Sequence, residues 1–365
     1  MTVTSALEQL VRSIPLFQWV DAAEVGEIAA LLKPVDLTPG DILFRQGEPG
    51  AAMWLLGAAP EVTISTVPPG QARPVAVAYA RAGEVVGEMA LIDDGPRSAT
   101  AVVTAGGLAH RIDTEAFNAL RSGFRPAAFK VLRRLSVDLC KRLRATNERI
   151  VPSGKGGVET APLMPGLRPN VEMLEAFPAF ATLPQVVRLA LSQKLELFEF
   201  PEITPLFAEG EESDGAWFLV SGEVSVGRNG KTLANLGPGS VFGIVSAIDS
   251  GTRSASCLTT GPAVLFRLKE KDFDALFAAG NRFAFQLVDL VARQLVAALR
   301  HANTMVPLPG GKEGARAPAA SPSTVTTMLQ AKDDAVLESD LPEIEVLAAE
   351  YEVDLSFAPL SEALG

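Results

Sequence analysis

Three residues in the first third of the chain have types and a spacing that could bind an anionic ligand. Gly87 directly precedes Glu88, and Arg97 lies ten positions after the glycine. A glycine can start a short helical turn whose free backbone N–H groups bind an anion. The carboxylate can accept a hydrogen bond from a hydroxyl group, and the arginine can pair with a phosphate. We therefore expect a ligand that carries one phosphate and one hydroxyl group.

A changed copy of this segment lies further along the chain. Gly243 and Arg253 keep the ten-residue spacing, but Ile244 replaces the carboxylate and Thr252 replaces the proline that precedes Arg97. A hydrogen bond to a charged group contributes roughly 1.5–3 kcal/mol, so its loss weakens binding by about tenfold to a few hundredfold. We expect the second copy to bind a ligand weakly, to bind an altered ligand, or to stay empty.

The first copy resembles the phosphate-binding cassette of cyclic-nucleotide-binding domains. The family pattern Phe-Gly-Glu-Leu-Ala-Leu is matched at 86–91, and Pro-Arg-x-Ala-Thr/Ser-Val is matched at 96–101. Val86 stands where the family usually has an aromatic residue, and Ala101 stands where valine is commoner. Neither departure removes a group that would bind the ligand.

The resemblance implies a role for each matched residue. Glu88 would accept a hydrogen bond from the ribose 2′-hydroxyl, Arg97 would pair with the cyclic phosphate, and backbone amides would complete the anion site. The residues expected at the ligand are Gly87, Glu88, Met89, Ala90, Arg97, Ser98 and Thr100. The degenerate second site keeps Gly243, Arg253 and Ser254. The resemblance implies cyclic AMP or cyclic GMP as the ligand, and Ser98 and Thr100 are compatible with either purine.

Repeat alignment predicts the architecture. The run at 47–56 aligns with 210–219, and the register continues beyond both cassettes. Short runs of Val, Ile, Leu and Phe between Gly and Pro predict antiparallel strands, and apolar residues three and four apart predict helices at 5–32, 129–144, 171–198 and 283–299. The expected fold is α+β, with two tandem antiparallel β-roll or jelly-roll barrels flanked by helices. The predicted domains are 1–150 and 171–306, joined by a linker at 151–170.

The helix after the first barrel carries two further candidate sites. In the resembling family this helix covers the base and often pairs subunits, so Ser136, Arg142, Thr146 and Asn147 are candidate base contacts. Arg133 and Arg134 with Ser136 also resemble a target of basophilic kinases. However, the leucine stripe on this helix predicts that the serine is half-buried.

Composition limits the remaining classes of protein. The chain has 365 residues, 48% of them hydrophobic and 21% charged, which suits two globular domains. The start of the sequence lacks a basic head and an apolar signal core, so we expect a cytoplasmic protein that does not enter a membrane. Cys140 and Cys257 lack a C-x-x-C spacing and are expected to be buried free thiols.

The sequence gives no sign of catalysis or of a metal or other cofactor. His110 and His301 have no Cys, His or carboxylate neighbour at the spacing of metal ligands. A disordered linker is expected at 307–332 and an acidic tail at 333–365. From Lys332 onward there are ten acidic residues and one basic residue, so DNA phosphates would be repelled.

Two functions follow from these expectations. The first is a cytoplasmic cyclic-nucleotide sensor and regulatory protein, which binds its ligand in the first domain and acts through protein–protein contacts. A partner protein could bind the tail, and the chain could form a homodimer. The alternative is a scaffold that keeps the barrels but binds no nucleotide, favoured by Val86 and by an irregular hairpin at Pro60. A third function, an enzyme or enzyme subunit that uses the pocket allosterically, is not supported by any catalytic motif in the sequence.

Overall fold

A computed structural model describes residues 3–67, 73–93, 95–152, 154, 158–161, 163–249 and 251–306, with backbone only for 3–5. The predicted linker at 307–332 and the acidic tail at 333–365 lie outside the described residues. The chain divides into two compact units, Met1–Leu135 and Ser136–Pro307, which meet inside one helix. We describe each unit by itself, and the predicted domain boundaries at 150 and 170 stay predictions.

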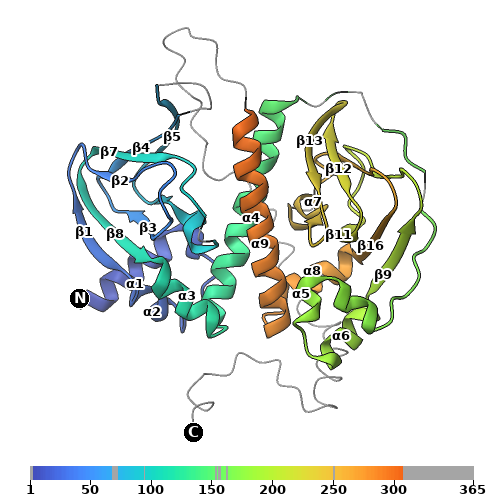
Figure 1. The fold of residues 1–365 in the computed structure, drawn as a ribbon. Helices are drawn as coiled ribbons and strands as arrows, with labels where there is room; N and C mark the ends of the chain where they lie inside the picture. Colours follow the sequence, from blue (N-terminus) through green and yellow to red (C-terminus); the bar gives the residue numbers. More distant parts are fainter. Residues whose placement is uncertain are drawn as a thin grey trace. The chain divides into compact units, whose positions relative to one another are not determined.

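The described strands of unit 1 form two antiparallel four-stranded sheets (Figure 1). One sheet has the order β1-β8-β3-β6 and the other has the order β2-β7-β4-β5. The strands are β1 (Lys33–Leu37), β2 (Ile42–Phe44), β3 (Ala52–Leu56), β4 (Glu61–Thr66), β5 (Val75–Ala80), β6 (Val85–Val86), β7 (Thr100–Ala105) and β8 (Gly107–Asp113). The helices are α1 (Val3–Ser13), η1 (Pro15–Phe17), α2 (Val25–Ala29), η2 (Glu88–Leu91), α3 (Thr114–Ser122) and α4 (Pro126–Ile150).

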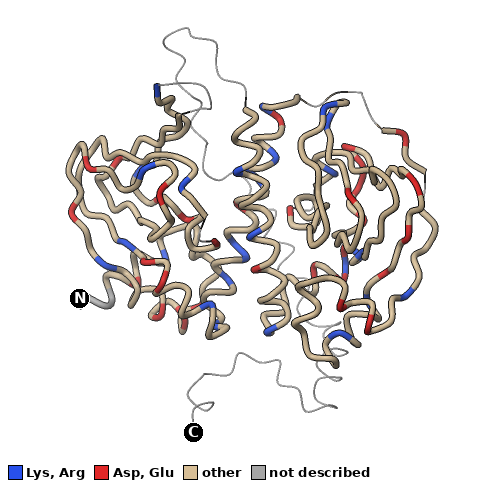
Figure 2. The backbone as a smooth tube through the Cα atoms, in the orientation of Figure 1, with Lys and Arg blue, Asp and Glu red and all other residues tan. Residues whose placement is uncertain are grey.

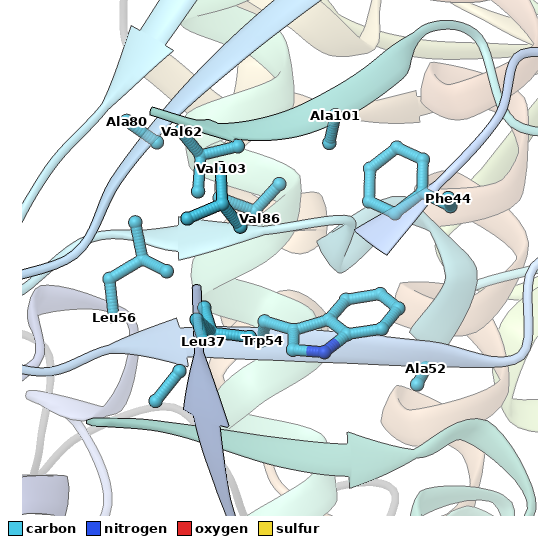
Figure 3. Packing of buried hydrophobic residues seen from close by; sticks show 11 residues of the cluster. Leu37, Phe44, Ala52, Trp54, Leu56, Val62, Ala80, Val86, Ala101 and Val103 are labelled. Carbon is cyan, nitrogen blue, oxygen red and sulfur yellow. The ribbon is translucent and has the colours of Figure 1, made fainter. Parts of the chain in front are cut away.

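The core of unit 1 lies between its two sheets. Every residue of β3 is buried, because the strand has neighbours on both edges and packs against side chains of the second sheet. Phe44 and Trp54 lie at one end of this core, with ring centroids 5.6 Å apart (Figure 3). Full burial of a large apolar side chain contributes roughly 1.5–3 kcal/mol. These two buried rings therefore stabilise the part of the core that lies next to Arg97 of the first cassette.

Unit 2 repeats the arrangement of two antiparallel four-stranded sheets, with the orders β14-β11-β16-β9 and β10-β15-β12-β13. Its core contains Phe198, Trp217 and Phe242. The strands are β9 (Leu195–Phe200), β10 (Pro205–Phe207), β11 (Gly215–Ser221), β12 (Val224–Arg228), β13 (Lys231–Leu236), β14 (Val241–Phe242), β15 (Ser256–Thr259) and β16 (Ala263–Lys269). The helices are η3 (Glu172–Ala176), α5 (Pro178–Ala181), α6 (Gln185–Ser192), α7 (Ile244–Asp249), α8 (Glu270–Ala278) and α9 (Arg282–Met305). The predicted α+β class with two tandem barrels and flanking helices is confirmed.

The predicted helices differ from the observed ones in their bounds and their continuity. The helix predicted at 5–32 is broken into α1, η1 and α2. The two helices that follow the barrels are present and longer than predicted, as α4 and α9. The segment at 171–198 is broken into η3, α5 and α6. Pro178 begins α5 and Pro184 directly precedes α6, because proline cannot continue a helix in its interior. The prediction of helix up to residue 198 is wrong, since Leu195 starts strand β9, which pairs with β16.

The predicted irregular hairpin in unit 1 is present as a change of register. The pairing of β4 with β7 shifts between Glu61 and Val62, directly after Pro60. Such a bulge accommodates a proline, which cannot donate a ladder hydrogen bond.

No described helix is by itself long and apolar enough to cross a membrane. The bent pair of α8 and α9, whose axes differ by 108°, meets the length and composition limits only when the two helices are joined.

Candidate functional site

The first cassette begins at a glycine whose backbone other residues rarely adopt. Gly87 has φ +84°, and η2 starts at the next residue, as the spacing predicts. A Cβ atom at Gly87 would lie 2.7 Å from Nη1 of Arg97 and 3.1 Å from the Phe44 ring. Both the conformation and the space therefore require glycine here. The turn places the first amides of η2 at a helix start, where backbone N–H groups attract an anion. The Ala90 amide instead donates to the Gly87 carbonyl oxygen at 3.1 Å.

Arg97 is buried, with 7% of its surface exposed, and its side chain is fixed by backbone carbonyl groups. Nη1 donates to the Gly87 carbonyl oxygen at 3.0 Å, and Nη2 donates to the Ala52 carbonyl oxygen. The guanidinium lies 4.2 Å from the centroid of the Phe44 ring and 5.6 Å from that of Trp54. Cation–π attraction and the two hydrogen bonds to carbonyl oxygens hold the positive charge beside the turn.

The backbone on both sides of Arg97 is bound to the turn that precedes β3. The Arg97 amide donates to the Glu48 carbonyl oxygen at 2.8 Å, and the Gly47 amide donates to the Arg97 carbonyl oxygen at 2.9 Å. Pro96 and Pro49 form an isolated bridge. The arginine is therefore positioned by a segment almost fifty residues away in the sequence.

The remaining predicted residues differ in their exposure. Glu88, the first residue of η2, is buried with 6% of its surface exposed, and Ala90 is buried too. Met89 and Thr100 are half-buried, and Ser98 is exposed. The Thr100 hydroxyl accepts a hydrogen bond from the Gln46 amide at 3.0 Å. The turn thus brings Gly87, Glu88 and Arg97 together, and the roles of all seven residues toward a ligand stay predictions.

The second cassette has the same turn but a different set of contacts around its arginine. Gly243 has φ +73°, and Nη1 of Arg253 donates to the Gly243 carbonyl oxygen at 2.7 Å. Nη1 also donates to the Ser246 hydroxyl at 2.9 Å, and Nη2 donates to the Gly215 carbonyl oxygen at 2.9 Å. The guanidinium lies 4.1 Å from the Phe207 ring centroid, as Arg97 does at Phe44.

A carboxylate of the chain itself also binds Arg253. Asp214 forms an ion pair with Nη2 of Arg253, and its other oxygen accepts from Nη1 of Arg267 at 2.7 Å. Burial lowers the pKa of the Arg253 guanidinium, and Asp214 opposes that effect. The aligned position in the first repeat is Ala51, which has no charge. Asp214 therefore gives Arg253 an anionic partner from a position where the first repeat has an uncharged residue.

Two further positions of the second cassette differ from the first in side-chain chemistry. Ile244 is buried with 5% of its surface exposed and occupies the place of the carboxylate. Ser246 occupies the place of Ala90 and directs its hydroxyl to Arg253. Ser254 is half-buried. Sequence reasoning found the loss at Ile244 but missed Asp214, which lies 39 residues from Arg253 and is joined to it only by the fold.

The candidate base contacts on α4 belong to unit 2. Thr146 and Asn147 are buried, Ser136 is fully buried, and Arg142 is exposed. Their predicted role toward a nucleotide in the first cassette stays a prediction. The expectation that Ser136 is half-buried is wrong, because none of its surface is exposed, and a kinase cannot reach such a hydroxyl in the folded helix.

The described residues hold no group of three or more His, Cys, Asp or Glu side chains arranged to bind a metal ion. Both cysteines are buried. Burial raises the pKa of the Cys257 thiol to about 12, so the thiol is neutral at physiological pH and unreactive.

Comparison with known proteins finds one family model that matches a stretch in each unit. The family model of the cyclic nucleotide-binding domain matches residues 34–123 and 197–279, which include both cassettes. The chain is 35% identical over 117 residues to the cyclic AMP receptor protein of Thermus thermophilus, covering 31% of this chain and 54% of that protein. It is 22% identical over 301 residues to a cAMP-dependent protein kinase type II regulatory subunit of Drosophila melanogaster, covering 80% and 66% of the two chains.

A solved structure also resembles the chain. The regulatory domain of Toxoplasma gondii protein kinase A, crystallised with cAMP, is 18% identical, with a TM-score of 0.31 over 76% of this chain and 93% of that one. The chain matches only about half the length of the Thermus protein and of the CRP-like regulator of Mycobacterium tuberculosis, 54% and 50% respectively.

Proposed function

We propose, on the premise that this chain belongs to the proteins with tandem cyclic nucleotide-binding domains, that it is a cyclic AMP sensor with one working site. The ligand binds the first cassette, and the second domain takes part in the resulting change of protein–protein contacts. The chain acts in the cytoplasm as a regulator without catalytic activity of its own, and its output is a contact with another protein. Cyclic AMP is proposed ahead of cyclic GMP because the names of several relatives carry cAMP.

The observation that carries this proposal is the arrangement of Gly87, Glu88 and Arg97. The buried Glu88 directly follows the glycine that starts the turn, and the buried guanidinium of Arg97 donates to the carbonyl oxygen of that glycine. The carboxylate suits a ribose hydroxyl, and the guanidinium with nearby amides suits a cyclic phosphate. A partly water-excluded site strengthens both interactions, because the effective dielectric constant is lower than in bulk water.

Isothermal titration of the full chain with cyclic AMP and, separately, with cyclic GMP tests the proposal. We expect saturable heat with cyclic AMP and a rise in melting temperature at saturating ligand, since a ligand that binds only the native state stabilises it. Tighter binding of cyclic GMP would change the assignment of the base. The absence of heat and of any thermal shift with both nucleotides would favour the scaffold function instead.

A further inference from the structure

The loop of the second cassette holds an arginine from helix α4. Nε of Arg144 donates to Oδ2 of Asp249 at 2.9 Å, and Nη2 donates to Oδ1 of the same carboxylate at 2.9 Å. Nη2 also donates to the Thr252 carbonyl oxygen at 3.0 Å. A two-point arginine–carboxylate pair fixes both distance and orientation, unlike a single charge contact. All three residues belong to unit 2.

The loop is shaped to receive this guanidinium. Oδ1 of Asp249 also accepts from the Gly251 amide at 3.1 Å, which holds the carboxylate in place. A Cβ atom at Gly251 would lie 3.0 Å from Nη2 of Arg144 and 3.0 Å from Oδ1 of Asp249. Gly251 does not have a positive φ angle, and a larger residue there would have to displace the Arg144–Asp249 pair by a few tenths of an ångström. Asp249, Gly251 and Thr252 together form a receptor for one arginine side chain.

Two further observations place the second half of α4 firmly on unit 2. Glu148 forms an ion pair with Arg228, whose Nε donates to Oε1 of Glu209 at 2.8 Å. Arg228 has only 5% of its surface exposed. Burial, together with the nearby Asp249 carboxylate, raises the pKa of the Cys140 thiol well above its usual range. The helix is therefore attached to unit 2 by the charged side chains of two successive turns, Arg144 and Glu148.

Helix α4 also belongs to the first domain. It is one unbroken helix of 25 residues, of which 126–135 lie in unit 1 and 136–150 in unit 2. In unit 1, Lys130 donates to Asp21 at 2.5 Å and to Glu24 at 2.9 Å, and Phe129 and Leu132 are buried. Figure 2 shows basic positions recurring along this helix. A continuous helix attached in both units can transmit a change in one unit to the other.

We infer that the second cassette has become a receptor for Arg144 of α4, and that this contact couples ligand binding in the first domain to the state of the second. The inference rests on the proposed function, because the ligand is cyclic AMP at the first cassette. If the ligand changes how tightly Arg144 is held, then releasing Arg144 must change the affinity for the ligand by the same factor. Linkage requires the two factors to be equal, but it does not say whether releasing Arg144 raises or lowers the affinity for the ligand.

The test is isothermal titration of full-length Arg144→Ala with cyclic AMP, beside Arg149→Ala as a matched control. Arg149 lies on the same helix and is exposed, so its loss removes an equal charge without removing the contact. We expect the Kd of Arg144→Ala to differ at least threefold from that of the wild type, and the Kd of Arg149→Ala to stay within 1.5-fold. An unchanged Kd in a folded Arg144→Ala variant would overturn the inference.

A second variant separates loss of the contact from loss of the fold. Asp249→Asn keeps the size of the side chain but removes its charge, and we expect it to shift the Kd in the same direction as Arg144→Ala. The double variant should show less than the product of the two single effects, because both remove one interaction. Multiplicative effects would also overturn the inference. A wild-type protein that gives no heat with cyclic AMP would instead refute the proposed function.

Discussion

The two cassettes share a backbone design and differ in what their arginines bind. In both, a left-handed glycine starts the turn, and an arginine ten positions later donates to the carbonyl of that glycine and lies over a phenylalanine ring. Only the first cassette has a carboxylate after the glycine, and only the second supplies Asp214 and Ser246 to its arginine. The comparison teaches that the turn is a structural feature of the barrel, which forms with or without a carboxylate after the glycine.

The largest expected effect comes from removing the arginine of the first cassette. Arg97→Ala should weaken cyclic AMP binding by about hundredfold or more, because a buried charge-assisted contact contributes about 3 kcal/mol and 1.4 kcal/mol is tenfold. Titration measures this, with a thermal melt to show that the barrel is folded. Arg253→Lys in the second cassette is the control and should leave the Kd within twofold. Equal affinity in wild type and Arg97→Ala would contradict the assigned site.

The carboxylate should matter next. Glu88→Ala is expected to weaken cyclic AMP binding by about tenfold to a few hundredfold, since the ribose hydroxyl loses its charged acceptor. Ile244→Ala, the matched change in the second cassette, should lower stability by about 2–4 kcal/mol through the cavity it leaves, but should not affect the Kd. A comparable loss of affinity in both variants would show that the second cassette also binds the ligand.

Substituting the two turn glycines separates an effect on the stability of the fold from an effect on ligand binding. Gly87→Ala and Gly243→Ala should each lower the free energy of unfolding by about 1–3 kcal/mol, because both positions have positive φ and a Cβ would collide with the arginine. Only Gly87→Ala should weaken cyclic AMP binding. Urea unfolding and titration of the same samples measure the two effects. A Gly243→Ala variant as stable as the wild type would show that the second turn is dispensable.

The carboxylate that binds Arg253 should act on stability alone. Asp214→Asn should lower the free energy of unfolding by about 1–3 kcal/mol, a reduced value because Asp214 is 39% exposed whereas Arg253 is almost fully buried. Urea unfolding beside Glu212→Gln, an exposed neighbour, provides the comparison. If both variants unfold at the same urea concentration, the ion pair does not stabilise the barrel.

A weaker effect is expected on the pH dependence of stability. Burial raises the pKa of the Glu196 carboxyl, but hydrogen bonds from Arg267 and Lys269 outweigh it, so the pKa lies below the usual value of 4.5. A lowered folded-state pKa stabilises the protein above the unfolded-state pKa, and this stabilisation is lost as the pH falls through the folded-state value. Glu196→Gln should therefore flatten the loss of stability below about pH 4.5, as measured by urea unfolding at several pH values. An unchanged profile would rule out this contribution.

The sequence predicted what local chemistry determines. The glycine turn at Gly87, the two barrels and the long helices after them follow from spacing and periodicity, and the structure has all of them. The contacts of Arg253 with Asp214 and of Arg144 with Asp249 could not be predicted, because the partners are 39 and 105 residues apart. The helix predicted to reach residue 198 failed for a related reason, since pairing with β16 decides the conformation of Leu195–Phe200.

The central claim is that one of the two cassettes binds the ligand. The most direct test is the stoichiometry of cyclic AMP binding to the full chain, measured by isothermal titration at protein concentrations well above the Kd. The account predicts one nucleotide per chain, and none in Arg97→Ala at the same concentrations. Two nucleotides per chain, with one retained in Arg97→Ala, would show that the second cassette binds cyclic AMP and would contradict the account.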